Sequence, residues 1–166
     1  MPACIYSIAE GYEAIADFEN ASDYYEAYAN AYEKSLAGGG RAHKAAPKKK
    51  GKGGEPAASP ERAQVWEEAK AQIGFFNAGV FRDGLGQYKA ALRNREKYLD
   101  LWGAPDKKGE MSKDAEAVFL SIADLHEKNG AYAKAMKQLE DYERKMLKDP
   151  NKVLTDQMLL RAAWGP

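Results

Sequence analysis

The chain has 166 residues, 45% of them apolar, and its 25 basic and 25 acidic side chains give a formal net charge of zero. This balance excludes a strongly basic nucleic-acid-binding protein, and the apolar content excludes a chain that is disordered throughout. One cysteine, Cys4, and two histidines leave no internal disulfide and too few ligands for a His/Cys zinc site. No apolar run approaches the roughly 18–20 residues of a membrane span, so we expect a soluble protein, cytoplasmic or periplasmic, without a transmembrane segment.

Residues 1–35 form the first predicted segment, an acidic and tyrosine-rich helical repeat. It contains seven acids and one base, Lys34, together with six of the ten tyrosines. Helical spacing of its apolar and small residues predicts helices over about 3–16 and 19–35. Tyr24, Tyr25, Tyr28 and Tyr32 form a stripe on the second helix. We expect this stripe to pack against the first helix and the next repeat, and the alternative is a surface for a partner.

Residues 36–60 form the second segment, which has a different composition. It contains six glycines, three prolines, six bases and one acid, and its only large apolar residue is Leu36. Such a stretch cannot bury enough surface to offset the entropy lost on ordering, so we predict a disordered Gly/Lys/Pro linker. Its basic run, which includes residues 48–50, could contact nucleic-acid phosphates or an anionic surface.

Residues 61–149 return to helical patterning. Ser59-Pro60-Glu61 is typical of a helix start and predicts a helix over about 61–82. Further helices are predicted over about 87–101, from Ser112 or Asp114 to His126 or beyond, and over about 132–147. A last helical stretch, about 152–164, makes residues 150–166 either a capping helix or the start of a further repeat.

A spacing pattern of small and aromatic residues appears three times along these predicted helices. A small residue is followed seven positions later by a turn residue, two positions later by an aromatic residue, and three positions later by an alanine. The three copies are Ala9, Ala16, Phe18 and Ala21; Gly79, Gly86, Tyr88 and Ala91; and Ala123, Gly130, Tyr132 and Ala135. They lie 70 and 44 residues apart, which equals a unit of 34 plus insertions of 36 and 10. We expect the small residues to lie where two helices cross and Tyr132 to wedge between helices.

This pattern resembles the tetratricopeptide repeat (TPR) family, whose unit is a 34-residue helix–turn–helix. The resemblance covers about 2–35, 72–105 and 116–149, although the tryptophan of the family's first helix is absent from all three copies. It implies an all-α fold in which antiparallel helix–turn–helix pairs stack as a short TPR-like solenoid. A generic antiparallel helix bundle is the alternative.

The resemblance also implies a function in binding: a protein–protein interaction module or scaffold that holds a peptide segment or partner subunit in a concave helical groove. It also implies that the chain is part of a larger multi-protein complex in a bacterium. The groove positions that it implies are Tyr6, Glu10, Glu13, Phe76, Val80, Asp83, Leu120, Asp124, Glu127 and Lys128. Five of the ten are acidic, which favours a basic partner. The alternative function is an adaptor for nucleic acid or an anionic surface through the Lys-rich linker.

The residues do not predict an enzyme, a cofactor or a bound metal. Gly79 and Gly84 have the spacing of a phosphate-binding loop, but the Lys and Ser/Thr that such a loop requires do not follow. His126 occupies the place of a packing tyrosine in the repeat, so we expect a packing histidine rather than a general base. The sequence does not name the partner, the process or the oligomeric state.

Overall fold

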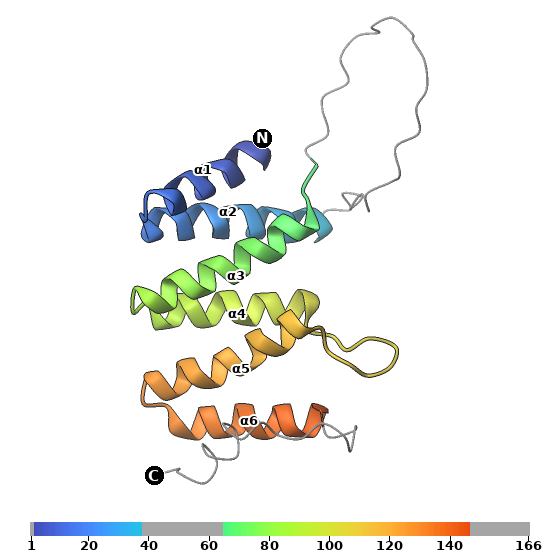
Figure 1. Ribbon diagram of the computed structural model, residues 1–166. Helices are drawn as coiled ribbons and strands as arrows, with labels where there is room; N and C mark the ends of the chain where they lie inside the picture. Colours follow the sequence, from blue (N-terminus) through green and yellow to red (C-terminus); the bar gives the residue numbers. More distant parts are fainter. Residues whose placement is uncertain (1, 38–64, 147–166) are drawn as a thin grey trace, which may run out of the picture. The chain divides into compact units, whose positions relative to one another are not determined.

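The computed structural model describes residues 2–37 and 65–146, and within these ranges it contains six α-helices and no strand (Figure 1). The helices are α1 (Pro2–Ala14), α2 (Phe18–Ala37), α3 (Glu68–Gly84), α4 (Tyr88–Trp102), α5 (Lys113–Lys128) and α6 (Tyr132–Met146). The predicted all-α class is confirmed. None of the helices that the structure describes is long and apolar enough to cross a membrane. Nearly all of the predicted linker, and the predicted capping segment 150–166, lie outside the described residues.

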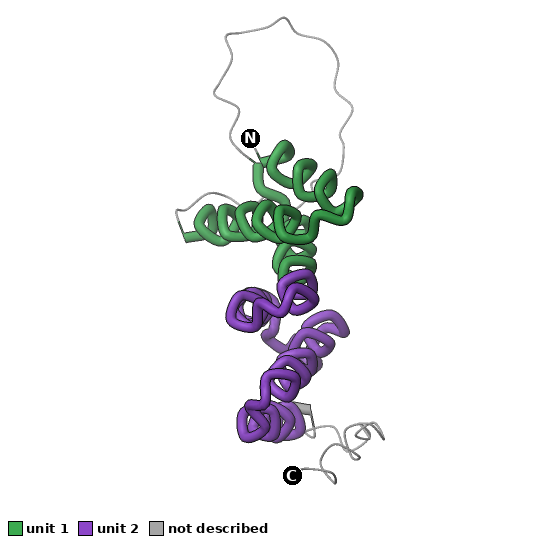
Figure 2. Tube along the Cα trace, turned by 90° about the vertical axis from the view of Figure 1, so that its left-hand side faces the viewer, with its two compact units in different colours: residues 1–78 green, residues 79–166 purple. Residues whose placement is uncertain are grey.

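The chain divides into two compact units, Met1–Ala78 and Gly79–Pro166, and the division falls inside the continuous helix α3 (Figure 2). The first unit holds α1, α2 and the first part of α3. The second unit holds the end of α3 together with α4, α5 and α6.

An aromatic cluster forms the core of the first unit. Tyr25, Tyr28 and Tyr32 are at most 3% exposed, and the ring of Tyr6 meets Tyr25 and Tyr28 edge-on at centroid distances of 5.5 and 5.3 Å. Edge-to-face contacts of this kind add to the stabilisation from burial. The expectation that the tyrosine stripe packs internally is therefore confirmed for these three side chains. Tyr24 of α2 is half-buried and stacks on a tyrosine of α1 other than Tyr6.

The predicted start of the third helix near residue 61 is wrong, because residues 65–67 are not helical and α3 begins at Glu68. Two tertiary contacts hold the non-helical residues 65–67 in place. The Trp66 ring lies edge-on to Tyr28 at 5.2 Å, and the backbone N–H of Glu67 donates to the Tyr28 hydroxyl at 3.0 Å. These contacts with α2 outweigh the preference of Ser59-Pro60 for starting a helix, which is a local signal.

The second unit is held by apolar side chains between α4, α5 and α6. Val118, Phe119, Ile122 and Leu125 of α5 are at most 5% exposed. Ser112 caps α5 by accepting a hydrogen bond from the backbone N–H three residues later, which satisfies a donor that the helix leaves unpaired. Further along, Tyr142 of α6 donates its hydroxyl proton to Glu116 of α5 and so ties the two helices together.

Three helix–helix turns share one backbone geometry. Ala16, Gly86 and Gly130 all have positive φ angles, of 58°, 71° and 71°. In each turn this residue's N–H bonds to the carbonyl three residues earlier, and the next N–H bonds to the carbonyl five residues earlier, at 2.8–2.9 Å. These two bonds define a Schellman motif. The positions that the sequence pattern aligned at steps of 70 and 44 residues thus hold equivalent turns.

Small residues lie at the predicted helix crossings. Ala9 and Ala21 of the first hairpin are fully buried, and Ala123 and Ala135 of the third are 2% and 7% exposed. A Cβ added to Gly79 would lie 3.3 Å from Cγ of Arg95, so α4 approaches α3 closely there. The expectation for Tyr132 is wrong, since its side chain is 51% exposed and does not wedge between helices.

Candidate functional site

The outward face of α3 carries three large apolar side chains. Ile73, Phe76 and Val80 are 44%, 40% and 46% exposed, and their spacing of three and four residues places them along one side of the helix. Two of them, Phe76 and Val80, are among the groove positions that the TPR resemblance implies. Exposed apolar side chains gathered on one helix face are typical of a surface that contacts another molecule.

Asp83, at the end of the same helix, is used inside the second unit. Its Oδ2 atom accepts from Arg95 of α4 at 2.9 Å and from Lys128 of α5 at 3.0 Å. Arg95 also donates to the carbonyl oxygen of Ser121 at 3.1 Å, so the cluster joins α3, α4 and α5. Burial alone would raise the pKa of the Asp83 carboxyl, but the hydrogen bonds from the two bases outweigh it and hold the pKa below its usual value.

The implied groove positions of the first unit fall into two kinds. Tyr6 is 6% exposed and belongs to the aromatic core, and Glu13 is half-buried and accepts the hydroxyl proton of Tyr25 at 2.5 Å. Burial, followed by this bond to Glu13, raises the pKa of Tyr25 far above its ordinary value. Glu10 is exposed. Of these three positions, only Glu10 is therefore exposed enough to contact another molecule without a rearrangement.

The remaining groove positions lie along α5. Leu120 and Asp124 are half-buried, whereas Glu127 and Lys128 are exposed. The structure brings Lys128 into contact with Asp83 and thereby joins two of the predicted positions.

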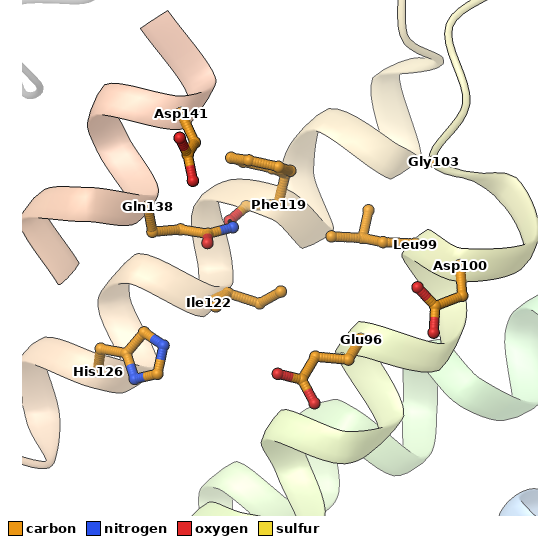
Figure 3. Close-up of a pocket in the computed structure, with 9 residues that line it drawn as sticks. All are labelled: Glu96, Leu99, Asp100, Gly103, Phe119, Ile122, His126, Gln138 and Asp141. Carbon is orange, nitrogen blue, oxygen red and sulfur yellow. Dashed lines mark hydrogen bonds between the residues drawn. The ribbon is translucent and has the colours of Figure 1, made fainter. Parts of the chain in front are cut away.

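A pocket of about 310 Å³ lies between α4, α5 and α6 (Figure 3). Leu99, Phe119 and Ile122 supply the apolar part of its lining. Three carboxylates line it as well: Glu96 and Asp100, one turn apart on α4, and Asp141 on α6. Gln138 donates its side-chain N–H to the carbonyl of Phe119 at 3.3 Å, which fixes that amide beside the pocket.

His126 lines the same pocket and is 8% exposed. Its Nδ1 atom shares a hydrogen bond of 2.7 Å with the Tyr88 hydroxyl, so the expected packing histidine is confirmed. Burial lowers the pKa of His126, the nearby Lys134 lowers it further, and Glu96 acts in the opposite direction. The imidazole is therefore neutral at pH 7 and does not cancel the charge of the three carboxylates.

Sequence reasoning missed the pocket. Its lining residues come from three helices, and their meeting depends on how the helices pack, which no local pattern reports. The one available signal was the pair of acids at positions 96 and 100, which share a helix face. His126 also lines the pocket, but the sequence pattern predicted only a packing role for it.

The α3 face and the pocket offer two different kinds of surface. In the ranges that the structure describes, no group of three or more His, Cys, Asp or Glu side chains is placed to hold a metal ion. The α3 face can bury apolar surface, and the pocket can accept hydrogen bonds and balance positive charge. Comparisons with protein-family models, with curated proteins and with solved structures give no match for this chain.

Proposed function

We propose that the chain is a TPR-like repeat protein that works by binding a peptide segment or partner subunit. The observation that carries the proposal is the exposed apolar face of α3, formed by Ile73, Phe76 and Val80. Removing this surface from water on docking is favourable by about 25 cal/mol for each Å² of apolar area. Two of these residues stand where the family resemblance implies a groove.

The three equivalent turns support the repeat part of this proposal. Ala16, Gly86 and Gly130 adopt the same left-handed conformation at the same place in three helix–turn–helix pairs. Repeated hairpins of this kind build extended surfaces for recognition when they stack. A stacked TPR-like solenoid is the arrangement in which the first helix of each pair would face the ligand.

The test compares two double variants in affinity capture followed by quantitative mass spectrometry. Phe76→Ser with Val80→Ser removes apolar surface from the α3 face. Ile15→Ser with Leu85→Ser is the control, because these side chains are 71% and 42% exposed but lie in turns outside that face. We expect wild type and control to capture the same proteins and the α3 variant to lose them. Equal capture by all three chains would refute the proposal for this face.

The adaptor function through the Lys-rich linker predicts a different result. Capture of nucleic acid or of anionic surfaces would be unaffected by the α3 variant and would fall steeply as salt increases. Those basic residues lie outside the described part of the chain.

A further inference from the structure

The pocket between α4, α5 and α6 carries an inference that does not depend on the α3 face. Its lining is mainly polar and includes three apolar side chains, and such a combination of convergent polar groups with apolar surface can hold a small group in a defined orientation. Its volume of about 310 Å³ is at the small end of the range for such sites and suits a single side chain or a comparably small group.

The charge of the pocket selects the kind of group. Glu96, Asp100 and Asp141 line it, and no Lys or Arg is among its lining residues in the part of the chain that the structure describes. Glu96 and Asp100 form no ion pair with another described residue. Asp141 pairs with the exposed Arg144 of its own helix at 3.2 Å, a surface contact worth about 1 kcal/mol or less.

His126 is a second, independent sign of a ligand. The side chain is more than nine-tenths buried, and Tyr88 occupies Nδ1, whereas Nε2 has no hydrogen-bond partner among the described residues. No buried side-chain nitrogen or oxygen is left unpaired in the described ranges, so Nε2 reaches accessible space, and the ring points from α5 into the pocket (Figure 3). In the tautomer in which Nδ1 carries the proton and donates it to the Tyr88 hydroxyl, Nε2 is an acceptor that a ligand N–H can fill.

We propose that this pocket binds the guanidinium group of an arginine side chain from a partner polypeptide. A guanidinium presents five N–H donors in one plane, which can reach carboxylates on both sides of a pocket, whereas a lysine ammonium is a compact point charge. Here carboxylates line the pocket from α4 and from α6, and α5 contributes the imidazole. The methylene stem of the arginine contacts Leu99, Phe119 and Ile122.

The test is a nuclear magnetic resonance titration of the full chain with the capped peptide acetyl-Ala-Arg-Ala-amide. We expect saturable shifts of backbone amides that line the pocket on α4, α5 and α6, with a dissociation constant in the millimolar range. Acetyl-Ala-Lys-Ala-amide is expected to bind at least about fivefold more weakly. Spermidine serves as a free polyamine and is expected to give no saturable shift at these amides.

Two matched variants decide the role of the carboxylates. Glu96→Gln with Asp100→Asn keeps the shapes of both side chains and removes their charge, so the arginine peptide should bind at least about tenfold more weakly. Glu140→Gln removes one exposed charge of α6 outside the pocket and should leave binding unchanged.

Three results would overturn the proposal: no saturable shift at the pocket, equal binding of the lysine peptide or of spermidine, or equal binding by the double variant. The variant Phe76→Ser with Val80→Ser should bind the arginine peptide as wild type does. A failure of the proposed function at α3 is thereby separated from a failure at the pocket.

Discussion

Replacing Asp83 by alanine tests how burial sets the value of an ion pair in this protein. Asp83 binds two bases at nearly equal distances, 2.9 Å to Arg95 and 3.0 Å to Lys128. The Arg95 side chain is 8% exposed and the Lys128 side chain 65% exposed. Distance alone would therefore make the two pairs equivalent, whereas burial makes them very different.

The expected magnitudes follow from what each substitution leaves behind. Asp83→Ala leaves the buried guanidinium of Arg95 without its carboxylate, and breaking a buried pair in this way costs about 3–5 kcal/mol. The bond from Arg95 to the carbonyl of Ser121 at 3.1 Å remains and favours the lower end of that range. Lys128→Ala removes an exposed partner, which costs about 1 kcal/mol or less.

Amide hydrogen exchange of the full chain measures both effects locally. A loss of about 3 kcal/mol corresponds to roughly 100-fold faster exchange in α4 and α5, and a loss of about 1 kcal/mol to roughly fivefold. The double variant Asp83→Ala with Arg95→Met should recover most of the protection, since an apolar pair needs no charge partner. If Asp83→Ala and Lys128→Ala accelerate exchange equally, the argument from burial is wrong.

Three further predictions concern the turns, the crossings and the buried histidine. Ala16→Gly should stabilise the first unit by about 0.5–1 kcal/mol in urea denaturation, because Ala16 has a φ of 58°, whereas Gly130→Ala should destabilise the second unit by about 1 kcal/mol. Ala135→Glu should cost about 3–5 kcal/mol, since this residue is 7% exposed at the α5–α6 crossing, and an unchanged melting temperature would contradict the alignment of the turns. Burial lowers the pKa of His126 below 6.5, with Lys134 lowering it further and Glu96 opposing. The unfolded chain therefore takes up the proton first, and stability should fall below pH 6.5 by at most about 1.4 kcal/mol per pH unit. The hydroxyl of Tyr88 also faces the ring, and a pH profile that is the same in His126→Gln would refute this last prediction.

Most of the helical framework could be predicted from the sequence because its signals are local. The turn at Ala16 is an informative case. A glycine, as at Gly86 and Gly130, indicates a left-handed backbone conformation, whereas an alanine does not. Its alignment with the two glycines nevertheless placed the turn, and the hydrogen bonds agree with that placement. A repeated pattern can thus identify a backbone conformation that the residue type alone would not indicate.

The errors arose where distant parts of the chain meet. The start of α3 at Glu68 is set by contacts of Trp66 and Glu67 with Tyr28, which lies about 40 residues earlier. Tyr88 packs beside His126 of the following hairpin at a ring distance of 6.0 Å, whereas Tyr132 is exposed and no helix after α6 is among the described residues. The same pattern position therefore has two environments, and spacing cannot tell them apart.

The predicted groove also changes character once the contacts of its acids are known. Five of its ten positions are acidic, which favoured a basic partner, but Glu13 is bonded to the Tyr25 hydroxyl and Asp83 to two bases. The two bases balance the charge of Asp83, so Asp83 adds little to the attraction of a distant cation, whereas the neutral hydroxyl leaves the charge of Glu13 in place but holds its carboxylate in the first unit. Recognition at the α3 face should accordingly depend on burying Phe76 and Val80, and recognition at the pocket on Glu96 and Asp100.

Binding at α3 should then change less than about threefold between 50 and 500 mM salt, whereas binding of an arginine peptide at the pocket should weaken by about tenfold over the same range. If both sites respond to salt alike, the separation of apolar from ionic recognition does not hold.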